Sequence, residues 1–165
     1  MKHILMILLA VLVALSGCTA VSPESGEPAG KDGGGDILTE PDESEEEQMS
    51  MMRMKINGTP VTVAWEDNES AAALKELAAG GLEIRMSMYG GFEQVGSIGQ
   101  RLPASDVQTT TSSGDIVLYS GSQLVVFYGS NSWAYTRLGH ITDKTPEEMR
   151  ALLGSGDVTV TLSVE

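Results

Sequence analysis

Short stretches of alternating apolar and polar residues recur along the chain from residue 52 onward. This alternation is typical of β-strands that bury one face. It predicts strands over residues 52–56, 61–65, 82–88 and 157–164. Asn57 and Gly58 follow the first of these strands, and this pair favours the two-residue turns of β-hairpins. We therefore expect the first two strands to form a hairpin.

Two further segments, residues 115–119 and 124–128, are almost entirely apolar. Such short apolar runs predict strands that are covered on both faces. The residues between them, 120–123, include a glycine, and we expect them to form a hairpin turn.

Helix signals occur at two places. Residues 71–77 are rich in alanine and leucine, Asn68 or Ser70 can cap their N-terminus, and Gly80-Gly81 ends the segment. Residues 145–148 have the spacing of a capping box with proline in the first turn, which predicts a second short helix.

Together these signals predict a mainly β fold of six to eight strands and two short helices. Strand–helix–strand units do not repeat along the chain, so we expect a closed or nearly closed β-barrel with the helices over its openings. An open antiparallel sheet is the alternative arrangement.

The start of the chain has the composition of a processed export signal. Residues 1–17 combine a short basic start with an apolar run of about a dozen residues, fewer than the roughly 20 that cross a bilayer. Leu15-Ser16-Gly17-Cys18 resembles the lipobox of bacterial lipoproteins. By that resemblance, Cys18 is the site of lipid attachment, and the protein is anchored to the outer face of a bacterial membrane, either the cell membrane or an outer membrane. A buried helix containing an inert cysteine is the alternative.

Residues 18–52 are predicted to be a disordered acidic linker that separates the membrane anchor from a domain at 53–165. From Thr19 to Met52 the chain has ten acidic residues and one basic residue, with few apolar ones. Calcium binding by residues 42–47 is the alternative, although the tract lacks the ligand spacing and glycine of a calcium loop.

Composition narrows the range of functions. The whole chain has 10 basic and 23 acidic residues, a net charge of −13, which argues against binding to nucleic acid. Its single cysteine excludes an intramolecular disulfide and a thiolate zinc site within this sequence. We predict no metal site and no cofactor.

Two glycine-rich stretches, residues 89–99 and 129–139, combine aromatic and hydrogen-bonding side chains in the way of ligand-lining loops. The alternative is that their glycines serve bends where a barrel strand turns a corner. Residues 106–115 form a polar link that either lines a cleft or makes a surface turn. The predicted ligand groove consists of Tyr89, Phe92, Glu93, Gln108, Ser130, Asn131, Trp133, Tyr135 and Arg137.

Residues for catalysis are few. His140 is the only histidine outside the predicted signal, and Ser132, His140 and Asp143 supply the types of a nucleophilic triad without the strand–elbow–helix motif around the serine. We therefore predict no catalytic residue. Arg137 can stack on Trp133 or form a surface ion pair.

Six segments in order resemble a bacterial cyclophilin-like family: KINGT at 55–59, EDN at 66–68, MYGGFE at 88–93, QTTT at 108–111, GDIVLY at 114–119 and YGSNSW at 128–133. The resemblance implies a compact cyclophilin-like β-barrel, often carried on a lipoprotein. Cyclophilins isomerise Xaa-Pro bonds with an arginine, a glutamine, and apolar and aromatic side chains, but their Phe-His-Arg and Phe-Met-x-Gln-Gly-Gly stretches are absent here.

From this resemblance and the residues above, we expect a membrane-anchored module that binds a peptide or a small molecule. The alternatives are a divergent peptidyl-prolyl isomerase that acts on exported proteins, and a structural or partner-docking domain without groove chemistry.

Overall fold

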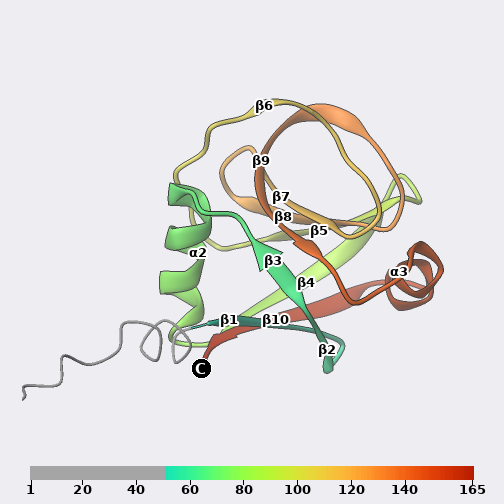
Figure 1. Ribbon diagram of the computed structural model, residues 1–165, viewed down its shortest axis with the longest axis horizontal. Coiled ribbons are helices and arrows are strands. Elements are labelled where there is room, and N and C mark those ends of the chain that lie inside the picture. Colours follow the sequence, from blue (N-terminus) through green and yellow to red (C-terminus); the bar gives the residue numbers. More distant parts are fainter. Residues whose placement is uncertain (1–50) are drawn as a thin grey trace, which may run out of the picture. The chain divides into compact units, whose positions relative to one another are not determined.

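The computed structural model describes residues 51–165, which form ten strands and two helices (Figure 1). The strands are β1 (Met52–Ile56), β2 (Thr59–Val61), β3 (Val63–Trp65), β4 (Leu82–Tyr89), β5 (Glu93–Ser97), β6 (Val107–Thr110), β7 (Asp115–Tyr119), β8 (Gln123–Phe127), β9 (Ser132–Ile141) and β10 (Val158–Val164). The helices are α2 (Glu69–Ala78) and α3 (Pro146–Leu153).

The strands form one antiparallel sheet in the order β2-β1-β10-β4-β5-β8-β7-β9-β3, and β6 pairs with β9 beside this path. The two ends of the path, β2 and β3, are separated only by Thr62, so the sheet curls back to where it began. The prediction of a nearly closed barrel with two short helices is therefore confirmed.

The segment 61–65, predicted as one strand, is divided at Thr62. β2 pairs with β1 and β3 pairs with β9, so the chain changes neighbours at this residue. The Thr62 N–H donates to Asp143 Oδ1 at 3.0 Å, and its carbonyl accepts from Thr142 N–H at 2.9 Å. These contacts satisfy the backbone N–H and C=O groups of Thr62, which belongs to neither of the two strand pairings.

The structure has more strands than the sequence predicted, because β5, β6 and most of β9 come from stretches expected to be irregular or to form a link, and because one predicted strand is divided into β2 and β3. β9 is long and changes partners: it pairs with β6 over residues 132–135, and with β7 and β3 farther along. A register shift between Ile116 and Val117 of β7 marks a bulge in this pairing.

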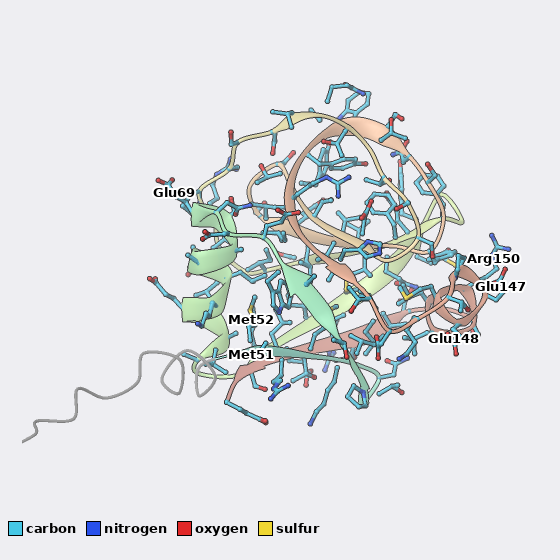
Figure 2. The ribbon with its side chains drawn as sticks, viewed as in Figure 1. Met51, Met52, Glu69, Glu147, Glu148 and Arg150 are labelled. Carbon is cyan, nitrogen blue, oxygen red and sulfur yellow. The ribbon has the colours of Figure 1, made fainter. Side chains whose placement is uncertain are left out.

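The main core fills the inside of the barrel with alternate residues of the strands and with apolar side chains of both helices. Asn68 caps α2 by accepting from Ala71 N–H at 2.9 Å, whereas Ser70 is buried and donates to the carbonyl of Pro103. Thr145 and Glu148 form the predicted capping box of α3. Met149 of α3 is buried, and Figure 2 shows Glu147 and Arg150 on its outer side.

A second, smaller apolar cluster lies on the opposite face of β7 and β8. Ile116 and Leu118 of β7 belong to the main core, whereas Val117 packs in the second cluster with Val125, Phe127 and Tyr135. This confirms that both faces of these two strands are covered. The outer face of the barrel therefore carries apolar side chains of β5, β7, β8 and β9. The candidate site lies over these strands.

Neither of the helices found in residues 51–165 is long and apolar enough to cross a membrane. The predicted signal peptide, Cys18 and the linker up to residue 50 lie outside the described residues.

Candidate functional site

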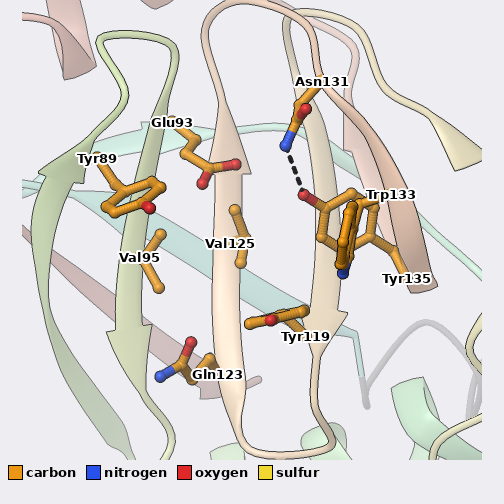
Figure 3. Close-up of a pocket in the computed structure, with 9 residues that line it drawn as sticks. All are labelled: Tyr89, Glu93, Val95, Tyr119, Gln123, Val125, Asn131, Trp133 and Tyr135. Atoms are coloured by element: carbon orange, nitrogen blue, oxygen red, sulfur yellow. Dashed lines mark hydrogen bonds between the residues drawn. The ribbon is translucent and has the colours of Figure 1, made fainter.

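A pocket of about 520 Å³ opens on this outer face of the barrel (Figure 3). Its lining residues come from the end of β4, from β5, β7 and β8, and from the first half of β9 and the residue before it: Tyr89, Glu93, Val95, Tyr119, Gln123, Val125, Asn131, Trp133 and Tyr135.

Strand register explains why these side chains meet. In neighbouring antiparallel strands, residues directly opposite one another project from the same face. Val125 of β8 lies opposite both Val95 of β5 and Val117 of β7, while Gln123 lies opposite Tyr119. Val95 and Val125 supply an apolar floor for the pocket, and this floor is continuous with the second apolar cluster, to which Val117 belongs.

Aromatic side chains form much of the rest of the pocket. Tyr89 and Trp133 are 67% and 57% exposed, respectively. Tyr135 is buried, and its ring packs edge-on against Tyr119 and Phe127, with centroids 6.0 and 5.7 Å apart. The pocket thus combines rings fixed by packing with rings that are open to solvent.

Glu93 is the residue of the pocket that an apolar environment perturbs most. It is only 5% exposed, and within residues 51–165 its Oε2 atom has no hydrogen-bond partner. Burial raises the pKa of its carboxyl group from 4.5 to about 7. Figure 3 shows the carboxyl group turned toward the middle of the pocket.

The side of the pocket formed by β9 is held by a hydrogen-bond network. Asn131 Nδ2 donates to the hydroxyl of Tyr135 at 3.0 Å, and Asn131 Oδ1 accepts from the Ser132 N–H at 2.8 Å. The backbone of Asn131 is joined to Thr111 on the neighbouring segment. Burial, and then the charge of Glu93, raise the pKa of Tyr135.

Five of the nine predicted groove residues line this pocket: Tyr89, Glu93, Asn131, Trp133 and Tyr135. Phe92 instead packs against the second cluster beside Gly129, and the carbonyl of Phe92 accepts from Tyr128 N–H. Ser130 donates its hydroxyl to the carbonyl of Thr111 at 2.7 Å. Gln108 lies exposed on β6.

Arg137 lies near the opposite end of β7 from Tyr119, where its Nη1 atom is 3.4 Å from Asp115 Oδ1. The same oxygen lies 2.8 Å from His140 Nδ1. Burial opposes ionisation of Asp115, but hydrogen bonds with His140 and Ser112 and the charge of Arg137 hold its pKa below the ordinary value. Of the two alternatives for Arg137, the ion pair is therefore the one observed.

The three residue types of a nucleophilic triad lie apart in their contacts. The hydroxyl of Ser132 is bonded to that of Thr110, His140 is paired with Asp115, and Asp143 contacts Thr62 and Lys144. Within residues 51–165, no group of three His, Cys, Asp or Glu side chains is placed to hold a metal ion.

Four lining residues were not predicted from the sequence: Val95, Tyr119, Gln123 and Val125. On β5 and β8 the lining residues are spaced by two, which is the period at which a strand returns to the same face. This spacing of two residues can be read directly from the sequence. It did not identify these residues because nothing in an isolated apolar strand says which of its two faces borders a pocket.

The chain matches a family model and is similar to a solved structure. A family model described as the cyclophilin-like family matches residues 54–163. Among solved structures, the solution structure of a hypothetical protein from Archaeoglobus fulgidus is similar, with 13% identity, a TM-score of 0.48, and coverage of 71% of this chain and 96% of that chain. No curated protein matches the chain.

Proposed function

Since the chain belongs to the cyclophilin-like family, we propose that it uses this fold as a binding module whose outer pocket receives an extended peptide or a small organic ligand. The family gives the fold but not the ligand, because unrelated activities share folds and reside in particular sites. The proposal therefore rests on the pocket.

The observation that carries the proposal is the exposure of Tyr89 and Trp133 beside a buried carboxyl group, over an apolar floor. A volume of about 520 Å³ lies within the range of small-molecule sites. Large aromatic side chains left open to water gain most from a ligand that covers them. If the domain served only as a scaffold, we would expect Trp133 to pack into the core, whereas it is 57% exposed.

Prolyl isomerisation is the less favoured alternative. Cyclophilins use an arginine to stabilise the twisted amide, and no arginine is among the nine lining residues of this pocket. Arg137 is paired with Asp115, and Arg85 is exposed on β4, 4.0 Å from Glu83. Neither arginine lines the pocket that would hold a proline.

We further propose that the module is exported and held to the outer face of a bacterial membrane through a lipid on Cys18, as the lipobox-like residues 15–18 suggest. The lipobox resemblance implies a diacylglycerol on this cysteine, and its two acyl chains are sufficient for stable anchoring. A Cys18→Ala variant that still takes up labelled fatty acid in bacterial cells would contradict this part of the proposal.

The binding proposal is tested by tryptophan fluorescence of the full chain during titration with blocked pentapeptides whose central residue is varied. We expect a saturable change in emission from Trp133. Trp65 provides a steady background, because its indole N–H is already donated to the carbonyl of Met52 at 2.8 Å.

The matched variants are Tyr89→Ala and Met88→Ala, which remove neighbouring exposed side chains of β4. Successive strand residues face opposite sides, and only Tyr89 lines the pocket. Tyr89→Ala should weaken binding at least about threefold and Met88→Ala should not, since a buried aromatic contact is worth about 0.5–1.5 kcal/mol beyond area. Equal effects of the two variants, or no saturable change with any peptide, would contradict the proposed site.

A further inference from the structure

Resting on the proposed function, we infer that the pocket is selective for organic cations and binds a primary ammonium group on an apolar stem, with Glu93 as its counter-ion. A lysine side chain of a peptide and a free alkylamine share this chemistry.

The charges of the lining residues support a cation. Glu93 is the only acidic residue among the nine, and none of them is Lys, Arg or His. An anionic ligand would therefore meet a carboxyl group without a cation to offset it. An ammonium group brings the N–H donors and the positive charge that the buried carboxyl group lacks.

The unpartnered carboxyl oxygen of Glu93 also favours a ligand that donates hydrogen bonds. A buried polar atom without a hydrogen bond is costly, and native structures keep few of them. In the part of the chain that the structure describes, Glu93 Oε2 is such an atom, in a residue that is only 5% exposed at a pocket open to solvent. A ligand donor that pairs with this carboxyl group would offset the cost.

The rings supply the second half of the recognition. Tyr89, Tyr119, Trp133 and Tyr135 line the pocket together with Glu93. The face of an aromatic ring attracts a cation, and the rings and the valine floor also cover an apolar stem. The domain has 8 basic and 13 acidic residues over 53–165, so its net charge of −5 favours the approach of a cation.

Ionisation of Glu93 makes the affinity of the pocket for a cation depend on pH. The other titratable groups of the pocket are Tyr89, Tyr119 and Tyr135, and the pKa of Glu93 is about 7 because of burial. A cation prefers the ionised carboxylate, so its affinity must rise with pH. A neutral ligand that accepts a hydrogen bond from protonated Glu93 must show the opposite trend.

The experiment is an NMR titration of the full chain at pH 6 and pH 8, followed at the indole N–H of Trp133 and the amide of Val125. The probes are Nα-acetyl-lysine methylamide, n-butylammonium, and neutral Nα-acetyl-norleucine methylamide. At least one ammonium probe should bind about tenfold more tightly at pH 8, because the ionised fraction of Glu93 rises from about one tenth to nine tenths. Binding of the lysine probe alone identifies a peptide source, and equal binding of both identifies the ammonium group as sufficient.

Glu93→Gln should remove both the pH dependence and the preference for ammonium over norleucine. Glu83→Gln is the control, because it removes the same charge from an exposed position of β4 outside the pocket. The inference is overturned if the norleucine probe binds as tightly as the lysine probe at pH 8, or if affinity falls with pH. Either result leaves the proposed binding function standing, whereas the absence of binding by all three probes overturns the inference and counts against the pocket as well.

Discussion

Among single residues, Glu93 shows how a side chain that lines a pocket lowers the stability of the folded protein. The residue begins β5 directly after the turn that follows Tyr89, and strand pairing sets these two residues opposite one another. Its side chain is then enclosed without a hydrogen bond to Oε2. Because burial penalises the charged form, the folded state holds the proton of Glu93 to a higher pH than the unfolded chain does.

The consequence is a loss of stability as pH rises. Between the unfolded pKa of 4.5 and the folded pKa of about 7, only the folded state keeps this proton, so the free energy of unfolding falls through this window. From pH 5 to pH 8 the loss from Glu93 amounts to about 2 to 3 kcal/mol. Glu93→Gln should lack it, and urea denaturation of both proteins at the two pH values measures the difference. Parallel pH profiles for wild type and variant would contradict the burial of an unpaired carboxyl group.

The role of a residue was predictable where the group that it contacts lies close to it in the sequence. The caps of the two helices, Asn68 and Thr145, were recognised because each acts on a backbone N–H three residues ahead. The partner of Arg137 was not, because Asp115 belongs to a neighbouring strand and the contact depends on the register of β7 and β9. Cross-strand contacts of this kind have no signature within one segment.

At the scale of elements, the β4–β5 hairpin both positions the site and bends the barrel. β4 pairs with β10 over Leu82–Met86 and with β5 over Ser87–Tyr89, so it changes partners midway. Gly96 of β5 lies against this point. A Cβ atom there would stand 2.6 Å from the carbonyl oxygen of Arg85 and 2.7 Å from Ile84 Cγ2. The close approach of the two strands therefore requires glycine.

Gly96→Ala should lower the free energy of unfolding by about 1–3 kcal/mol, as expected when extra volume is forced into a packed interior. Gly80→Ala is the matched control, because its Cβ would have no neighbour nearer than 4.0 Å. That change should alter the free energy of unfolding by less than about 1 kcal/mol. Chemical denaturation measures both, and equal stability of the two variants would show that β4 and β5 do not approach as closely as described.

Two of the strands that prediction missed, β5 and β9, share a physical reason. β5 and β9 contain glycines at which the strands bend or approach a neighbour, and glycine in isolation favours turns and loops. Tertiary pairing holds these segments extended in spite of that preference. The division at Thr62 was missed for a related reason, because alternation continues across a corner and does not record which strand is the neighbour.

At the scale of the whole molecule, the sheet curls into a barrel with a main core inside and a smaller apolar cluster outside. The barrel was predictable because strand signals outnumber helix signals and the motifs resemble a known family. The pocket was predictable only in part, from the aromatic residues near the glycines. Its floor depends on which face of β8 turns away from the main core, and this is a property of the closed sheet rather than of any single strand.

We propose that the outer pocket binds its ligand without isomerising it. The most direct measurement is an NMR titration of the full, isotope-labelled chain with a blocked lysine–proline tetrapeptide, which reads amide shifts of the protein and cis–trans exchange of the peptide together. We predict shifts concentrated on β5, β8 and the first half of β9, with peptide exchange as slow as in the absence of protein. Accelerated exchange, or shifts centred on α2 and the residues around it, would contradict binding without isomerisation at this pocket.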